Sequence, residues 1–382
     1  MKRLTSKKKL HRQCILTGLL GLFLLTCHKA VLKQLPSPRP IARPGLRSIQ
    51  DTLVFPLQLK WKKRLQSAPG KILTAIDSLI FAVTDGGHLF IVESRSGRTV
   101  WKKHFRKRPG LLCVPDDSLL ILCWSAGHRP VKAIGYTSGQ ELWNRDFGNI
   151  PVLPLILDRY IFLANASGTV RCLHKKTGEL CWKISLNKTV SGCMAYSAES
   201  LILTTEEGTV WNLSRDDGQV LWQTPLDEEI TGGPVYTRGS VLVGTTTGTF
   251  RALQESDGSL LWQFRARGGI YQPCCTDDSS LYFGTSQGLF YCLDMKLGSP
   301  EWMYDTESVI GTSPVINGGV VLFGILDKTL FALNRRTGHP EWQFELKGRV
   351  RTRPLIWKGM LFAGCEHEIL YAFESSRVHE ND

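Results

Sequence analysis

The sequence predicts an all-β fold, an eight-bladed β-propeller of four-stranded antiparallel blades, with the last blade closed by the N-terminal strand. Three observations predict it. Tryptophans recur about every 40 residues, a glycine precedes nearly all of them at a fixed distance, and each end of the chain carries only part of a repeat. Short strands in evenly spaced units of this length are typical of propellers.

Eight of the eleven tryptophans obey one period, with successive members 39 to 42 residues apart. They are Trp61, Trp101, Trp143, Trp182, Trp222, Trp262, Trp302 and Trp342. A glycine stands four residues before seven of them, at Gly97, Gly139, Gly178, Gly218, Gly258, Gly298 and Gly338. Because both residue types keep one register over seven units, we interpret them as the structural positions of a repeat.

The unit around Trp262 shows how each repeat folds. Residues 241–244 form a β-rich run, Gly248 marks a turn, and residues 249–253 alternate in polarity as a second strand does. The segment 256–258 has hairpin-turn chemistry, and the strand over 260–264 carries the tryptophan. In three other units a proline, at position 234, 314 or 354, stands at the start of the first strand. A proline is tolerated there because its missing N–H is not needed for a hydrogen bond of the sheet. Each unit is therefore a four-stranded meander.

The ends of the chain decide the number of blades. The strand around Trp61 has no unit before it, and the unit after Trp342 stops before its own tryptophan. We expect the N-terminal strand to complete the last blade, because closure removes sheet edges that invite aggregation. The domain prediction is a propeller over residues 51–376 followed by a tail over 377–382.

The first 50 residues are predicted to lie outside the propeller. Residues 1–26 combine a basic start with a short apolar run, as in a signal peptide. The sequence Leu24-Leu25-Thr26-Cys27 resembles a bacterial lipobox, although Thr26 replaces the usual Gly, Ala or Ser, and Cys27 is the predicted lipidation site. Ordinary secretion and an uncleaved signal anchor are the alternatives. Residues 27–50 contain four prolines and form a predicted tether.

The chain has a net charge of +13, and six positive charges fall within the first twelve residues. The remaining excess is weak evidence for nucleic acid, which we do not expect as a partner, and is compatible with an anionic membrane. Basic residues gather over 60–64, 102–108 and 347–353. They are interpreted either as one patch beside the tether or as an ordinary solvated surface.

No residue is predicted to be catalytic, to bind a cofactor or to hold a metal. The adjacent pair Cys274 and Cys275 falls in the repeat columns of strand residues, which favours core cysteines over a redox site. Cys172 and Cys181 are not interpreted as a disulfide. Blade packing is the expectation for the three tryptophans outside the period, Trp124, Trp211 and Trp357. The Asp pairs at 116–117, 216–217 and 277–278 lie in predicted turns, without the convergent oxygens of a cation site.

The repeat resembles that of the quinoprotein (PQQ-dehydrogenase-like) propellers, most clearly from Phe331-Ala332-Leu333 through Thr337-Gly338 to Trp342. The resemblance covers about residues 52–376 and implies the fold, whereas members of this superfamily include both enzymes and scaffolds. Repeats of minimal length leave little room for the insertions that cap a quinone in the enzymes.

The signal, the lipobox-like cysteine, the tether and the minimal propeller together resemble the BamB-type lipoproteins. This resemblance implies a non-catalytic scaffold without a cofactor, bound to protein partners of the machinery that assembles β-barrels and anchored by lipid at the periplasmic face of the bacterial outer membrane. Two alternatives stay open: an envelope propeller that binds a glycan or peptide, and a PQQ-dependent dehydrogenase.

Overall fold

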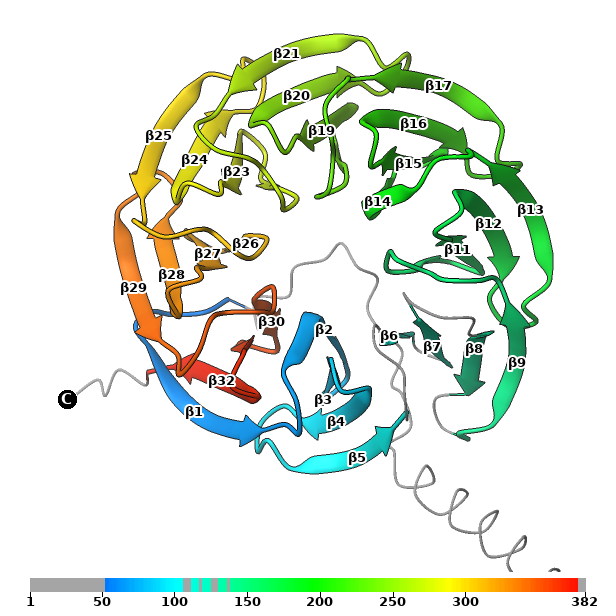
Figure 1. Ribbon diagram of the computed structural model, residues 1–382. Helices are drawn as coiled ribbons and strands as arrows, with labels where there is room; N and C mark the ends of the chain where they lie inside the picture. Colours follow the sequence, from blue (N-terminus) through cyan, green and yellow to red (C-terminus); the bar gives the residue numbers. More distant parts are fainter. Residues whose placement is uncertain (1–51, 106–110, 117–118, 125–129, 136–137, 377–382) are drawn as a thin grey trace, which may run out of the picture.

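The computed structural model describes residues 52–105, 111–116, 119–124, 130–135 and 138–376. These residues form a closed ring of eight four-stranded sheets around a central channel (Figure 1). The predicted signal peptide, the tether with Cys27 and the C-terminal tail lie outside the described residues. Among the residues described, no helix is long and apolar enough to cross a membrane.

The first four blades follow one another along the chain, each running from an inner strand at the channel to an outer strand at the rim (Figure 1). Blade 1 contains β2 (Pro69–Ile76), β3 (Leu79–Thr84), β4 (His88–Glu93) and β5 (Thr99–His104). Blade 2 contains β6 (Leu111–Pro115), β7 (Leu119–Trp124), β8 (Pro130–Gly135) and β9 (Glu141–Asp146). Blade 3 contains β10 (Leu155–Leu157), β11 (Tyr160–Ala164), β12 (Thr169–His174) and β13 (Leu180–Ser185). Blade 4 contains β14 (Val190–Tyr196), β15 (Ser200–Thr205), β16 (Thr209–Ser214) and β17 (Val220–Pro225).

The next three blades repeat the same meander, and the eighth combines both ends of the described chain. Blade 5 contains β18 (Val235–Thr237), β19 (Ser240–Gly244), β20 (Thr249–Gln254) and β21 (Leu260–Arg265). Blade 6 contains β22 (Cys275–Thr276), β23 (Ser280–Gly284), β24 (Leu289–Asp294) and β25 (Pro300–Asp305). Blade 7 contains β26 (Val315–Asn317), β27 (Val320–Gly324), β28 (Thr329–Asn334) and β29 (Pro340–Glu345). Blade 8 contains β30 (Leu355–Trp357), β31 (Met360–Cys365), β32 (Ile369–Ser375) and β1 (Leu57–Arg64).

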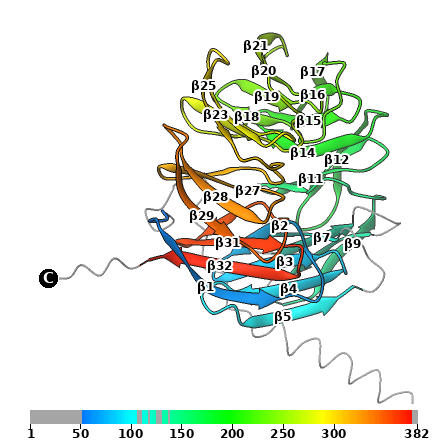
Figure 2. The same cartoon turned by 60° about the vertical axis from the view of Figure 1, so that its left-hand side comes forward.

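The N-terminal strand closes the ring, which confirms the prediction of a split last blade. β1 runs antiparallel to β32, from the pair Leu57 and Ser375 to the pair Arg64 and Ile369. Both views show β1 on the outer side of β32, between the rims of blades 7 and 1 (Figures 1 and 2). In the other blades every strand pairs with a strand next to it in the sequence. The ring is therefore closed by this one pairing between strands that are far apart in the sequence.

The hydrophobic core is distributed around the ring. Eight clusters of buried apolar side chains each join two neighbouring blades. Between blades 8 and 1, for example, Phe362 packs with Phe90 and Leu65. Between blades 7 and 8, Trp342 packs with Leu330 and Phe373. Blade 8 therefore contributes to two clusters, and without its N-terminal strand both would be incomplete.

The periodic tryptophans lie on the outer strands and reach into the next blade. Seven of the indole N–H groups donate to a backbone carbonyl there: Trp61 to Ser94, Trp143 to Lys175, Trp182 to Arg215, Trp222 to Glu255, Trp262 to Met295, Trp302 to Arg335 and Trp342 to Leu57. The donor-to-acceptor distances run from 2.6 to 3.0 Å. The last of these bonds joins blade 7 to the N-terminal strand of blade 8.

Six of the seven periodic glycines lie directly against these indoles. All seven have positive φ, between 65° and 75°. For six of them, a Cβ atom would come within 2.3 to 2.7 Å of the tryptophan of the preceding blade: Gly97, Gly178, Gly218, Gly258, Gly298 and Gly338. The glycine is thus required twice, for its backbone conformation and because the neighbouring indole occupies the space of a side chain.

A β-bulge precedes each tryptophan of blades 1 to 7. In blade 3, Cys172 pairs with Trp182 but the next residue, Leu173, pairs with Leu180. Cys181 is therefore an extra residue in the outer strand, and the same shift recurs one residue before each of the other six. Bulges bend a strand and increase its twist. Strand alternation in the sequence did not predict them.

Candidate binding surfaces

The meander gives the ring two different faces. The turns between the first and second and between the third and fourth strands of each blade open on one side, which we call the turn face. The turns between the second and third strands and the connections between blades open on the other, the connector face. Outer strands form the rim and inner strands line the channel (Figure 1).

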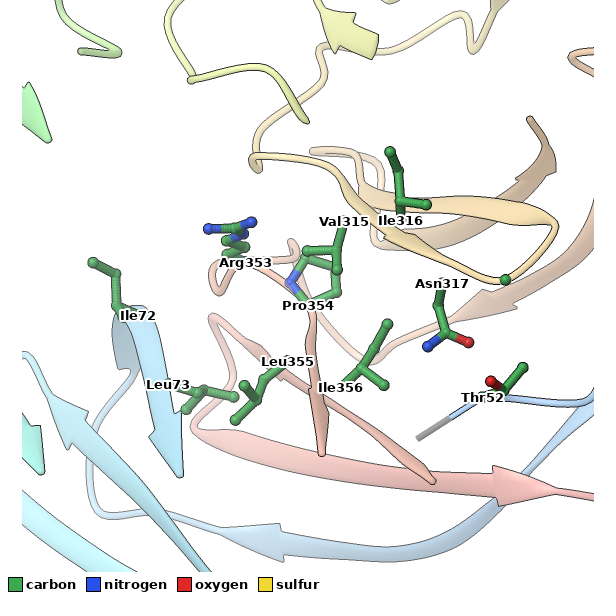
Figure 3. A pocket seen from close by; sticks show the side chains of 11 residues that line it. Thr52, Ile72, Leu73, Val315, Ile316, Asn317, Arg353, Pro354, Leu355 and Ile356 are labelled. Carbon is green, nitrogen blue, oxygen red and sulfur yellow. The ribbon is translucent and has the colours of Figure 1, made fainter. Parts of the chain in front are cut away.

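A groove with apolar side chains on its walls and polar groups at its ends lies where the inner strands of blades 7, 8 and 1 meet. We call it the channel groove; its volume is about 410 Å³. Val315 and Ile316 of β26 and Leu355 and Ile356 of β30 form its walls, with Ile72 and Leu73 of β2 on the far side (Figure 3). Asn317 stands at the turn-face end, where its side-chain oxygen accepts the Leu53 N–H at 2.7 Å and fixes the start of the described chain.

Arg353 places a positive charge at the connector-face end of the channel groove (Figure 3). Its backbone N–H donates to the carbonyl of Lys71 at 2.9 Å, which joins blade 8 to blade 1 beside the groove. No carboxylate among the described residues lies within 4.0 Å of the Arg353 guanidinium. A groove with apolar walls and a cation at one end is suited to an apolar chain that carries a carboxylate.

The connector face of blade 5 is held by a partly buried ionic cluster. Glu228 accepts hydrogen bonds from the hydroxyls of Thr245 and Thr249 at 2.8 and 2.9 Å, and from Thr247. Its second oxygen accepts from Arg251 at 2.7 Å. Burial alone would raise the pKa of Glu228, but the three hydroxyl bonds and Arg251 outweigh it and lower the pKa to about 2. The cluster fixes the connection between blades 4 and 5.

The outer strands of blades 3 to 5 each expose apolar side chains just before the tryptophan of the repeat. We call this set the apolar rim, and it consists of Leu180, Val220, Leu221, Leu260 and Leu261, each between 41% and 54% exposed. On other blades the outer strands expose charged side chains. β1 and β5 expose Lys60, Lys62 and Lys102, whereas β25 and β29 expose acidic side chains. Exposed apolar side chains of this kind with charged flanks are typical of protein-binding surfaces.

The basic segments do not form one cationic patch. Residues 60–64 and 102–103 lie on neighbouring outer strands, but 347–353 runs along the connector face to the channel. Four of these cations have acidic partners: Lys60 pairs with Glu374, Arg64 with Glu368, Arg349 with Glu366 and Arg351 with Asp85. Residues 106–108 lie outside the described chain.

The repeats of this chain match the profile of a known protein family. A profile described as outer membrane protein assembly factor BamB matches residues 127–229, 206–308 and 272–377, three overlapping stretches that together cover well over half of the chain. The chain belongs to the BamB family. No curated protein matches its sequence significantly.

Two solved structures share the BamB-family fold of this chain. BamB from Moraxella catarrhalis superposes with a TM-score of 0.70 at 16% identity, over 83% of this chain and 99% of that one. The computationally designed protein Ika8 superposes with a TM-score of 0.72, also at 16% identity, over 82% of this chain and 98% of the other. At this identity the likeness establishes the architecture alone.

Within this BamB-family propeller, the adjacent cysteines belong to two different cores. Cys274 is buried in the cluster between blades 5 and 6, and Cys275 packs against the cluster between blades 6 and 7. Both thiols are free. Burial raises the pKa of Cys274 to about 12 and that of Cys275 well above its ordinary value. The packing agrees with the interpretation of these two residues as core cysteines.

The three tryptophans outside the period also pack against blades. Trp124 is buried between blades 1 and 2, and Trp211 packs against the cluster between blades 3 and 4. The Trp357 indole donates to the Asp77 carbonyl at 2.7 Å, which ties β30 to blade 1. All three therefore occupy packing positions, as expected.

Three of the turn aspartates make ion pairs between blades, whereas Asp217 accepts a hydrogen bond from the Gln219 N–H within its own turn. Asp116 lies 2.7 Å from Lys175, and Asp277 lies 3.2 Å from Arg335, in the equivalent position four blades on. Asp278 pairs with Arg238 at 2.5 Å. Asp117 lies outside the described residues. Within the described ranges, no three His, Cys, Asp or Glu side chains converge as a metal site would require.

Sequence reasoning missed the channel groove. Most of its residues occupy a few adjacent positions of the repeat, at the start of the inner strand. Each of these residues looks ordinary alone. The available signal was Arg353, which replaces Gly233, Pro273 and Ser313 in the column that precedes each inner strand. A charge at a position that faces the channel was the one departure from the pattern.

Proposed function

We propose that this chain is a non-catalytic, protein-binding scaffold of the bacterial cell envelope that acts with the machinery that assembles outer-membrane β-barrels. The observation that carries the proposal is the match to the BamB family over residues 127–377. The relative of known structure is named as BamB, and the matching profile as an outer membrane protein assembly factor.

The N-terminal sequence supports the proposed location. A signal peptide over 1–26, lipidation of Cys27 and a proline-rich tether over 27–50 would hold the propeller at the periplasmic face of the outer membrane. The propeller would then present its rim and both faces to proteins assembled beside it. We propose the apolar rim of blades 3 to 5 as the contact, because its apolar side chains are exposed on three neighbouring outer strands.

Affinity purification of the full chain from detergent-solubilised membranes, with mass spectrometry of what is recovered, tests this function. Recovery of the barrel-assembly subunits is expected, and the same spectra will show whether Cys27 carries lipid. Repeated recovery of other proteins without any barrel-assembly subunit would contradict the proposal.

A matched pair of variants tests the contact surface. The double change Leu221→Asp and Leu261→Asp places two charges on the apolar rim, and we expect the partner to be lost. The control Gln223→Asp and Gln263→Asp places the same charges on the same strands, at exposed polar positions. Equal recovery with both variants would exclude the rim as the contact. Circular dichroism must show that both variants remain folded.

The channel groove favours a second candidate, an envelope propeller that binds peptides. Its apolar walls and the exposed Arg353 suit a peptide with an apolar end and a free carboxylate. Fluorescence anisotropy with peptides that differ only in a free or amidated C-terminus tests this. Preference for the free acid that disappears in Arg353→Gln supports the candidate; no preference excludes it.

A further inference from the structure

The bulge in blade 3 brings two cysteines together. Cys172 lies in the middle of β12 and is buried, at 1% exposure. Cys181 is the extra residue of the bulge in β13, between Leu180 and Trp182, and is exposed. Since Cys172 pairs directly with Trp182, the neighbouring bulge residue is held opposite the same short stretch of β12.

Blade 6 shows where a side chain at this bulge position points. There the equivalents of Cys172 and Cys181 are Cys292 and Glu301, with the same register shift. The Cys292 thiol donates to the Glu301 carboxylate at 3.0 Å. A side chain at the bulge thus reaches back across the strand pair to the buried cysteine, and in blade 3 that side chain ends in a second thiol.

We infer that Cys172 and Cys181 form a disulfide that links the outer strand of blade 3 to its neighbour when the protein meets a disulfide oxidant. Both thiols are free in the reduced chain. Disulfides need Cβ atoms about 3.5–4.5 Å apart, somewhat closer than the roughly 4.5–5.5 Å between directly opposite residues of an antiparallel pair, so a small shift at the bulge closes the bond. The repeat register gave no reason to pair these residues, because the bulge is invisible in the sequence.

The difference in exposure between the two thiols determines which of them reacts first with the oxidant. Cys181 is exposed, whereas burial, and then the neighbouring Cys181, raise the pKa of Cys172. The Cys181 thiolate attacks oxidised glutathione, forms a mixed disulfide and releases one reduced glutathione. The Cys172 sulfur then attacks the Cys181 sulfur, forms the protein disulfide and releases a second. Two protein thiols lose two protons and two electrons, and one glutathione disulfide gains them.

The full native chain, reduced and then treated with oxidised glutathione, provides the test. After free thiols are alkylated, trypsin releases Cys172 in the peptide 172–175 and Cys181 in the peptide 177–183. We expect mass spectrometry to find these two peptides linked as the main product at Cys181, and to lose the link after reduction. A chain in which Cys181 carries glutathione while Cys172 remains alkylated would overturn the inference.

Two variants sharpen the result. Cys181→Ser should abolish the link and leave Cys172 unmodified, because the buried thiol has no other exposed sulfur beside it at the bulge. Glu301→Cys places a thiol opposite Cys292 in blade 6 and should form the corresponding link. If Glu301→Cys links and the native pair does not, blade 3 differs from blade 6 in geometry and the inference is wrong. Oxidation in concentrated urea is the control for random pairing.

Discussion

Gly258 shows at the residue scale how the two most regular positions of the repeat depend on each other. It has a φ of 72°, and an added Cβ would lie 2.5 Å from the Trp222 ring and 2.5 Å from the Thr224 hydroxyl. Gly239 in the same blade has a φ of 77° but open space around it. The two glycines share the backbone requirement and differ in the space around them, which at Gly258 is occupied by the indole and the Thr224 hydroxyl.

That difference predicts unequal effects of the same substitution. Gly239→Ala should lower the free energy of unfolding by about 1 kcal/mol, the strain of an L-residue at positive φ. Gly258→Ala should lower it by about 2–4 kcal/mol, because the methyl group must also displace the indole. Urea unfolding measures both. Equal losses would mean that the indole moves aside freely and does not fix the contact between blades.

Glu228 predicts a dependence of stability on pH. Its pKa falls from an ordinary 4.5 to about 2 in the folded chain, so the folded state favours the carboxylate. The stabilisation is complete above pH 4.5 and is lost as the pH falls towards 2. Its size is at most about 3.5 kcal/mol, since a fall of about 2.5 in pKa corresponds to about 1.4 kcal/mol for each pKa unit.

Glu228→Gln should therefore destabilise the protein at pH 7 and flatten the part of its stability profile between pH 5 and 2. Glu229→Gln, one residue away and exposed, is the matched control and should leave the profile unchanged. Thermal unfolding across this pH range measures the effect. A variant profile parallel to that of the unmodified chain would remove Glu228 as the cause.

β1 is the element on which closure depends. It pairs with β32 and receives the Trp342 hydrogen bond at Leu57, and Leu65, the residue directly after it, joins the cluster between blades 8 and 1. No other blade draws strands from both ends of the described chain. Removing β1 would leave β32 with an exposed sheet edge, which favours pairing with a second chain.

Two truncations test this role. A chain that begins at residue 52 should remain monomeric and unfold near the temperature of the full chain. A chain that begins at residue 66 should unfold well below it and associate into larger species. Size-exclusion chromatography with light scattering, together with thermal unfolding, distinguishes them. A monomeric, stable second truncation would show that blade 8 closes without β1.

The strands were predictable from the sequence because their signals are local. Alternating polarity, turn glycines and the proline before an inner strand each act within a few residues. The contact of Trp222 with Gly258 is not local, since periodicity gives both positions but does not say that the indole belongs to the next blade. The bulge at Cys181 changes which side chains face each other without changing the pattern of residue types. The channel groove needs strands from blades 7, 8 and 1 and follows only from closure.

At the scale of the whole molecule, the core is a ring of eight interfaces. A linear array of repeats has free ends that fray, and its stability is a sum over neighbouring units. Here each blade is held on both sides, and the clusters continue through blade 8. Opening any one interface therefore strains the others, so we expect the described domain to unfold as one unit.

Two cavity variants on opposite parts of the ring test this cooperativity. Phe81 is buried between blades 1 and 2, and Phe323 between blades 6 and 7. Phe81→Ala and Phe323→Ala should each lower the free energy of unfolding by about 3–5 kcal/mol, and their effects should add because the sites share no partner. If the ring unfolds as one unit, both variants shift a single transition that is the same by tryptophan fluorescence and by circular dichroism. If blades unfold independently, each variant produces an early partial transition, and the two probes separate. That outcome would show that each blade is stabilised only by its two neighbours. Closing the ring would then add little stability beyond that of the pairing of β1 with β32.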